Sequence, residues 1–343
     1  TRKESSAASD VYKRQGRARV RPMPVGYRGS VRDYFGVIGE ALVDVVLSDT
    51  ATPRAHVGGS PLNVAVGLSR LDLPALFAGR FGSDEYGEMI AAHLRDNGVR
   101  SLLGPDSAPT SQATARLDPT GAASYEFELD WTLPPADELV ERYGHDIGGR
   151  LVHLHAGSIA TMLAPGDAEV MGLLALLQPT TTLSYDPNVR PSIVPDREFA
   201  RKRAEQSVRL ADVVHASDED IAWLYPDRPL LESIQAWQRM GPALVVMTRG
   251  AEDILAVTAH EVYERPIFPV DVADTVGAGD SFTAALLAAL DDRSLLGAEN
   301  REKLRGIRHS DLESVLIYAS RASAITASRP GADPPNRAEL VDD

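Results

Sequence analysis

The 343-residue sequence contains no cysteine. This absence excludes disulfides, thiolate metal ligands and thiol nucleophiles, and it is typical of proteins from a reducing compartment. Any chemistry must therefore come from carboxylates, hydroxyls, amides and histidines.

Long hydrophobic runs are missing as well. No uninterrupted apolar stretch reaches the roughly 18 residues that a membrane span needs, and no apolar signal core follows the basic residues near the N-terminus. We therefore expect a cytoplasmic protein with no membrane partner.

Positive charge is scarce, because 35 Lys and Arg face 49 Asp and Glu, for a net charge of −14. Such a balance disfavours binding to nucleic acid or to anionic membranes, which both need a cationic surface. Residues 1–33 are the exception, with a balance of +6 and little apolar content, and we expect a disordered basic tail there. Part of this tail, SSAASDVYKRQ, resembles translated sequencing-adapter sequence, which makes Met23 an alternative natural start. A nucleic-acid-binding arm is the less favoured interpretation.

Three common nucleotide-binding motifs are also absent. The sequence has no Walker G-x-x-x-x-G-K-[ST], no G-x-G-x-x-G after its first apolar run and none of the protein-kinase loop motifs. Phosphate binding, if present, must rest on a different glycine-rich segment.

From Tyr34 onward, short apolar or β-branched runs alternate with longer amphipathic segments. This alternation is typical of βαβ units around a mostly parallel sheet. We expect residues 34–46 to open the sheet and a helix to follow Gly59, with Ser60 as its N-cap and Pro61 at its first position. Further strands are expected near residues 74–82, 150–157, 180–187, 211–217 and 243–250.

Residues 112–130 interrupt this rhythm. They read as a β-hairpin with its turn at Asp118-Pro119-Thr120-Gly121. In the second arm, apolar and acidic residues alternate, so one face needs a cover. The substrate, the main domain and a second subunit are all candidates, and an ordinary edge hairpin is the simpler alternative.

The segment DTVGAGDSFTAALLAAL, residues 274–290, carries the strongest chemical signal. A loop of Gly277, Ala278 and Gly279 that leads into a helix lets backbone amides converge where the helix dipole favours an anion. Asp280 in the first turn is, taken alone, more simply explained as a cap. A phosphate cradle beside a carboxylate, however, supplies the two parts that phosphoryl transfer to an alcohol requires.

This segment, together with GGSPLNVAVGLSRLD at residues 58–72, resembles the two signatures of the PfkB (ribokinase-like) carbohydrate kinases. Intermediate segments resemble bacterial fructokinases of that family, over roughly residues 34–335. The resemblance implies an α/β fold, namely a ribokinase-like three-layer αβα sandwich with a small β-sheet lid. We expect the lid near residues 45–57 and 112–130, a C-terminal tail at residues 336–343, and a homodimer formed through the apolar lid face.

The resemblance also implies residue roles. Asp44, Gly58, Gly59 and Asn63 would bind sugar hydroxyls, and side-chain-free glycines would let the sugar approach the backbone. Asp280 would be the catalytic base toward ATP, with the amides of Gly277, Ala278 and Gly279 as its anion hole.

The nucleotide and metal side departs from the family pattern. Mg²⁺, held through water near an N-x-x-E motif in the family, would here face Ser217 and Asp220. Thr248 and Gly250 resemble the nucleotide loop, but Asp253 replaces a common glycine and Ser320 an expected asparagine. A monovalent cation is a further candidate ligand.

Arg190, in DPNVR, could pair with an acidic substrate, with a phosphate of ATP or with neighbouring loops. This segment is similar to those of fructokinases and of 2-keto-3-deoxygluconate kinases alike. We therefore expect a fructokinase, with a sugar-acid kinase or a catalytically silent sugar- or nucleotide-binding regulator as alternatives. His153 and His155 alternate on a strand, and we expect them at the edge of the core rather than on a metal.

Overall fold

The computed structural model describes residues 32–48, 51–117, 123–145 and 148–340. Residues Arg32–Asp343 form one compact unit, while the expected basic tail up to residue 31 and the turn at residues 118–121 lie outside the described residues. No helix in the described ranges is long and apolar enough to cross a membrane.

A nine-stranded sheet forms the centre of this unit, in the order β13-β12-β11-β10-β9-β8-β1-β4-β5. All its neighbouring strands are parallel except the pairs β11–β12 and β12–β13. Its strands are β1 (Arg32–Ile38), β4 (Ala75–Ala78), β5 (Arg100–Ser101), β8 (Gly149–Gly157), β9 (Thr182–Asp186), β10 (Val213–Ser217), β11 (Leu244–Thr248), β12 (Ile254–Val257) and β13 (Val262–Arg265).

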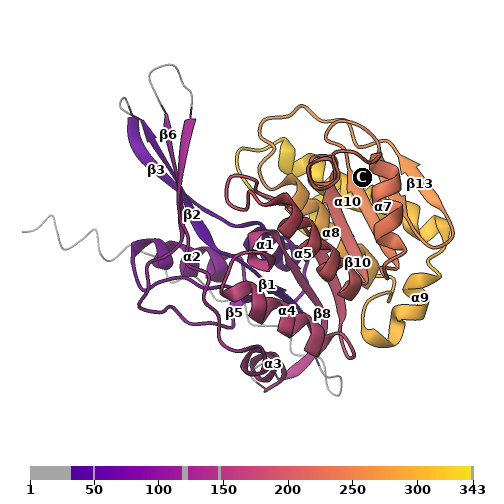
Figure 1. Ribbon diagram of the computed structural model, residues 1–343, viewed down its shortest axis with the longest axis horizontal. Coiled ribbons are helices and arrows are strands. Elements are labelled where there is room, and N and C mark those ends of the chain that lie inside the picture. Colours follow the sequence, from indigo (N-terminus) through magenta and orange to yellow (C-terminus); the bar gives the residue numbers. More distant parts are fainter. Residues whose placement is uncertain (1–31, 49–50, 118–122, 146–147, 341–343) are drawn as a thin grey trace, which may run out of the picture. The chain divides into compact units, whose positions relative to one another are not determined.

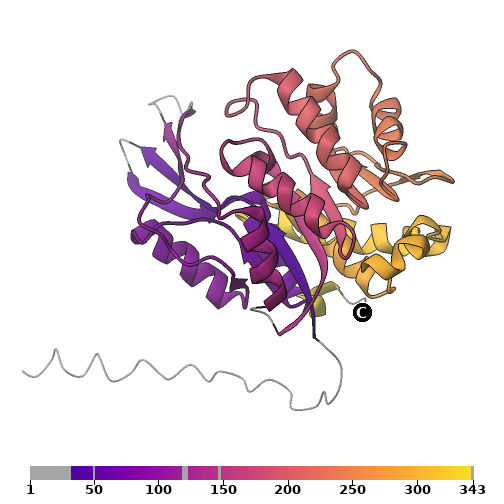
Figure 2. The same cartoon turned by 60° about the horizontal axis from the view of Figure 1, so that its bottom comes forward.

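Helices cover both faces of the sheet (Figures 1 and 2), because successive side chains of a buried strand point to opposite faces. One core cluster joins the sheet to α1 (Ser60–Arg70), α2 (Glu85–Asp96), α8 (Ala278–Asp291) and α10 (His309–Ala327). Two others join its opposite face to α3 (Ala136–His145), α4 (Gly166–Leu177), α5 (Arg197–Leu210), α6 (Asp218–Leu224) and α7 (Leu230–Gln238). The predicted three-layer αβα fold is confirmed.

A second sheet of four strands has the order β3-β2-β6-β7 and stands apart from the large sheet in Figure 1. It comprises β2 (Leu42–Ser48), β3 (Ala51–Gly58), β6 (Gln112–Leu117) and β7 (Ala123–Glu128). We call it the lid sheet. The run at residues 34–46, which we expected to be a single opening strand, is therefore two strands in different sheets, separated at Gly39–Ala41.

The described residues that follow α8, up to Leu340, belong to the body of the protein. The short α9 (Arg301–Arg305) precedes α10, and a 3₁₀ turn at Arg337–Leu340 follows it. Leu340 is buried, and Arg337 donates hydrogen bonds to the Leu71 carbonyl at 2.9 and 3.0 Å. At least this part of the expected tail is therefore packed structure.

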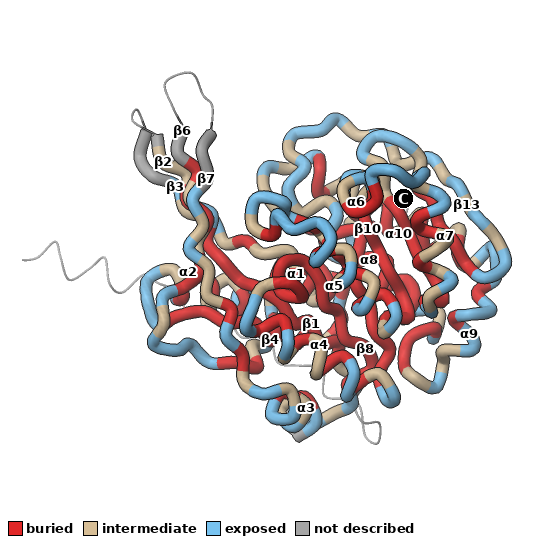
Figure 3. The backbone as a smooth tube through the Cα atoms, viewed as in Figure 1, coloured by how far each residue is buried: buried red, intermediate tan, exposed pale blue. Residues whose placement is uncertain are grey.

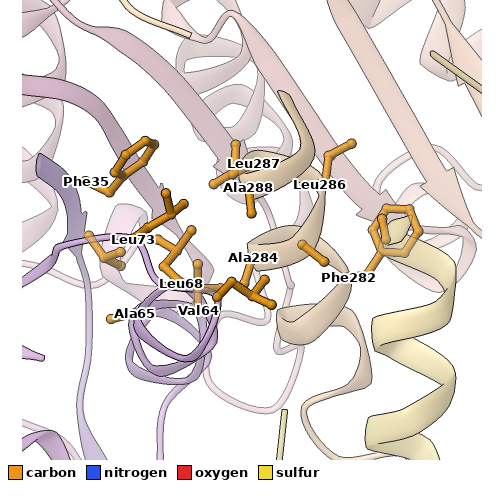
Figure 4. Close-up of a cluster of buried hydrophobic side chains, with 14 of the residues drawn as sticks. Phe35, Val64, Ala65, Leu68, Leu73, Phe282, Ala284, Leu286, Leu287 and Ala288 are labelled. Atoms are coloured by element: carbon orange, nitrogen blue, oxygen red, sulfur yellow. The ribbon is translucent and has the colours of Figure 1, made fainter. Parts of the chain in front are cut away.

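Burial is highest along the strands of the large sheet and along α8 (Figure 3). Helix α8 packs on α1 and α10, and Figure 4 shows its Ala284 on the side that faces Val64 and Leu68 of α1. A glycine permits the close crossing, because a Cβ on Gly67 would lie 2.6 Å from the Ala284 Cβ. The α1–α8 spacing therefore depends on Gly67.

We predict that Gly67→Ala destabilises the protein although alanine is the better helix former. Overpacking costs about 1–3 kcal/mol, whereas the gain in helix propensity is about 0.5–1 kcal/mol. Gly144→Ala in α3 is the matched control, since nothing lies within 4 Å of its added Cβ. Urea unfolding should show a lower midpoint for Gly67→Ala and an unchanged or higher one for Gly144→Ala. Equal effects of the two variants would contradict the close crossing.

Candidate active site

A cavity of about 2090 Å³ lies where the parallel strands end, the usual ligand position in open α/β sheets. Its walls come from the lid strands β2, β3 and β6, from the segments after β9, β10 and β11, and from the first turn of α8. Every residue to which the sequence assigned a substrate, nucleotide or catalytic role lines this one cavity: Asp44, Gly58, Gly59, Asn63, Arg190, Ser217, Asp220, Thr248, Gly250, Gly277, Ala278, Gly279 and Asp280.

The N-terminus of α8 has the geometry of an anion cradle. Gly277 is its N-cap, with a φ of 75°, a conformation that favours glycine. A Cβ there would also lie 2.5 Å from the Ala332 Cβ. The amides of a first helical turn have no intrahelical acceptor, so those near Gly279 can serve a ligand in the cavity.

Asp280 does not cap its own helix, since no side-chain cap bond is present at the start of α8. Its carboxylate instead accepts hydrogen bonds from Ser60 Oγ at 2.6 Å and Asn63 Nδ2 at 2.8 Å. The predicted role of Ser60 as an N-cap is therefore wrong, because Gly59 holds that position and the Ser60 side chain points to Asp280. These bonds connect the two segments that resemble the family signatures, residues 58–72 and 274–290.

Burial raises the pKa of Asp280 to about 6. The bonds from Ser60 and Asn63 oppose this rise, as does the positive charge of Arg190, while the negative charge of Asp186 adds to it. A carboxylate in this range accepts a proton more readily than an ordinary aspartate and is still ionised at neutral pH. The site thus places a carboxylate with a raised pKa beside the backbone amides at the N-terminus of α8.

On the lid side, the Asp44 carboxylate lies against Gly58, so that an added Cβ would collide with Asp44 Oδ2. The two residues occupy paired lid strands, and Asp44 is directly opposite His56. Partial burial raises the pKa of Asp44, whereas the charges of His56 and Arg190 lower it. Gly58 therefore gives the acid room to face the cavity.

Arg190 is exposed, and within the described ranges its guanidinium bonds to its own loop, namely to the Asn188 carbonyl and side-chain oxygens and to the Val189 carbonyl. It has no carboxylate partner among the described residues. In the part of the chain that the structure describes, no hydrogen bond joins Arg190 to a second loop, as the bridging alternative requires. A cation in this position is available to an anionic ligand.

Ser217 and Asp220 form a capping box at the start of α6, and Asp220 also accepts from the Val189 amide at 2.8 Å. Burial and the nearby charge of Asp186 raise the pKa of Asp220. No described group of three or more acids or histidines could ligate a metal directly. Two interacting carboxylates at the cavity wall do fit a cation that is held through water.

The nucleotide side comprises Thr248 at the end of β11 and Gly250, whose φ is 53°. Asp253 closes this turn, because its carbonyl accepts from Arg249 Nε at 2.6 Å. Ser320 on α10 lines the same cavity, and its hydroxyl accepts from the Phe268 amide at 3.1 Å. The Ser320 side chain therefore holds backbone at the cavity edge, whereas the Asp253 contact uses a main-chain carbonyl that a glycine would also supply.

His153 and His155 lie deeper than the core edge at which we expected them, because both are fully buried. His153 bonds to Thr182 and Ser184, and His155 shares the Ser184 hydroxyl. Burial lowers the pKa of His153 to about 3 and that of His155 to about 4. They are neutral polar residues of the sheet interior.

Sequence reasoning missed His215, on β10. Its imidazole contacts Asp186, Thr248 and Thr283 in the cavity floor. The available signal was its position two residues before Ser217, on a strand that ends at the site. The same reasoning could have found Asp186, at the end of β9.

A cavity at the strand ends, an anion cradle and a tuned carboxylate together define a phosphotransferase that acts on an alcohol. The model of the pfkB family carbohydrate kinases matches residues 33–339. The chain belongs to this family and is a carbohydrate kinase.

Curated relatives include probable fructokinase-4 of Arabidopsis thaliana, 32% identical and aligned over 86% of this chain and 91% of the relative. A fructokinase of Rhizobium leguminosarum bv. trifolii is also 32% identical, over 75% and 80% of the two chains. Similar solved structures include a fructokinase from Vibrio cholerae O395 with fructose, ADP and potassium ion bound, at 25% identity and a TM-score of 0.73, covering 91% and 98%. Ribokinase from Thermotoga maritima, 19% identical over 90% and 97%, shares the fold with a TM-score of 0.66.

The bond from Ser60 should be visible in the pH dependence of turnover. Removing it in Ser60→Ala takes away a donor that lowers the pKa of Asp280, so this pKa should rise above about 6. The acid limb of the kcat/KM profile should then move to higher pH, because the base is protonated over a wider range. Ser314→Ala, at a half-buried serine of α10 that lies outside the cavity lining, is the control. An acid limb that moves down or stays in place in Ser60→Ala would contradict the assignment.

Proposed function

We propose that the protein is an ATP-dependent fructokinase in which Asp280 is the general base. One observation carries this proposal. Asp280, hydrogen-bonded by Ser60 and Asn63 and with a pKa of about 6, lies in the first turn of the helix whose N-terminus forms the anion cradle.

In the proposed reaction, the sugar lies between the lid and α1, with Asp44, Asn63 and the backbone of Gly58-Gly59 as hydrogen-bond partners. Asp280 accepts the proton of the attacking sugar hydroxyl. The oxygen of this hydroxyl bonds to the terminal phosphorus of ATP, while the bond from that phosphorus to the ADP oxygen breaks. The Gly277, Ala278 and Gly279 amides stabilise charge on the transferring group. The lid sheet excludes water that would otherwise accept the phosphoryl group.

Mg²⁺ would neutralise charge on the triphosphate. Asp220, with Ser217 and the neighbouring Asp186, would hold this ion through water, since the Asp220 oxygens already accept from Ser217 and Val189. Thr248 and Gly250 would border the nucleotide. A monovalent cation is a further proposed ligand, and a potassium ion is bound in the Vibrio fructokinase.

Fructose is the favoured substrate because curated relatives at 31–32% identity are named as fructokinases or probable fructokinases. A 2-keto-3-deoxysugar acid is the second candidate, and the observation that favours it is the guanidinium of Arg190, which lines the cavity and has no carboxylate partner among the described residues. That the protein forms a homodimer and is cytoplasmic are predictions from the sequence.

The first test measures ATP turnover with Mg²⁺ on fructose, ribose, 2-keto-3-deoxygluconate, fructose phosphates and nucleosides, with wild type beside Asp280→Asn. We expect turnover of fructose and a loss of about 10²–10⁴-fold in kcat in the variant, with fructose and ATP still bound. Turnover of another sugar would reassign the substrate. Binding of sugar or ATP without any turnover would support the silent regulator instead.

Arg190→Ala separates the two substrate candidates. If Arg190 recognises a substrate carboxylate, kcat/KM for 2-keto-3-deoxygluconate should fall about 10²-fold or more, because a charge-assisted pair is lost. The value for fructose should change much less. Equal losses on both sugars would exclude carboxylate recognition and point to a role toward ATP. Arg228→Ala, which removes an arginine stacked on Tyr225, controls for the loss of one positive charge.

A further inference from the structure

His215 lies beneath the first turn of α8. Its imidazole stacks on Phe282, labelled in Figure 4, with ring centroids 4.9 Å apart. Its Cε1 would be 3.8 Å from a Cβ on Gly279. The ring is only 3% exposed, yet it reaches the cavity floor. It therefore supports the amide cradle from the sheet side.

Both ring nitrogens have partners. Nδ1 lies 2.8 Å from Asp186 Oδ2 and 3.1 Å from Thr283 Oγ1, and Nε2 lies 3.2 Å from Thr248 Oγ1. Because a carboxylate only accepts, the network assigns the Nδ1 proton to the bond with Asp186. In the neutral ring, Nε2 then accepts from the Thr248 hydroxyl.

These contacts join three elements that border the phosphate end of the cavity. Asp186 ends β9 and is itself held by the Asn188 amide at 3.0 Å. Thr248 ends β11, next to the nucleotide turn, and Thr283 belongs to α8. A single buried ring thus sets the height of Gly279 above the sheet and the orientation of the Thr248 hydroxyl.

We propose that His215 is a positioning residue for the terminal phosphate of the nucleotide. Through Thr248 and the first turn of α8, it keeps the groups that would contact this phosphate at a fixed spacing. Phosphoryl transfer is sensitive to such spacing, because a displacement of about 1 Å can cost about 10²-fold in rate. The inference rests on the proposed use of ATP.

Four variants test it. His215→Phe keeps the stacking on Phe282 and loses both hydrogen bonds. His215→Gln places its amide near the Nε2 position and can still reach Thr248, while Thr248→Val removes the hydroxyl at constant size. His309→Phe is the matched control, since His309 also bonds to an acid, Glu261, and contacts an aromatic ring, Tyr263, but lies on the exposed face of α10.

We expect His215→Phe to lower kcat about 10²-fold and to weaken ATP affinity about tenfold, the loss of one hydrogen bond to a charged ligand. ADP affinity and the KM for the sugar should stay within about twofold, because neither ligand carries the terminal phosphate. Thr248→Val should lose the preference for ATP over ADP in binding to the same extent. His215→Gln should retain part of this preference. His309→Phe should match wild type.

Equal weakening of ATP, ADP and sugar in His215→Phe would reduce His215 to a packing role and overturn the inference. An unchanged ratio of ATP affinity to ADP affinity in Thr248→Val would also overturn the inference. Thr248→Val provides the test if His215→Phe fails to fold. Turnover of the sugar panel by the wild-type protein distinguishes a failure of the proposed function from a failure of the proposed role of His215. Absence of sugar turnover would refute the proposed function, while the ATP and ADP affinities still test His215.

Discussion

The structure depends on the burial of one carboxylate between two helices that are far apart in the sequence. Ser60 and Asn63 on α1 donate to Asp280 on α8, across a crossing that is close because Gly67 has no side chain. A buried charge without hydrogen-bond partners would cost several kcal/mol. These two donors therefore connect the α1 and α8 walls of the cavity, and they hold the proposed base in place between them.

Other buried carboxylates beside the cavity also have hydrogen-bond donors. Three carboxylates, those of Asp186, Asp220 and Asp280, border the cavity, and the charge of Asp186 raises the pKa of both Asp220 and Asp280 beyond the effect of burial. Hydrogen bonds from backbone amides, from the Ser60 and Ser217 hydroxyls, from the Asn63 side-chain amide and from the His215 imidazole satisfy these carboxylates. An acidic floor of this kind suits a site whose proposed nucleotide arrives with a divalent cation.

Much of the site could be predicted from the sequence because its parts are local. The glycines before α8 and the pair before α1 are required by backbone conformation and close approach, and both leave a readable pattern. Ser60 shows the limit of such reasoning. A serine before a helical run predicts a cap. The Ser60 hydroxyl instead donates to Asp280, 220 residues away in the sequence, and a rule based on neighbouring residues cannot predict such a partner.

The sequence by itself determined the α/β class, the family and the glycine-rich segment that we propose as the anion cradle, because periodicity, glycine positions and motifs are properties of short segments. The tertiary structure decided which residues share one cavity, where the first apolar run divides between two sheets, and how His215 joins β9, β11 and α8. It also decided the pKa of Asp280, since burial and partners from distant segments set that value. Such properties arise from contacts at long sequence separation, which exist only after the chain has folded.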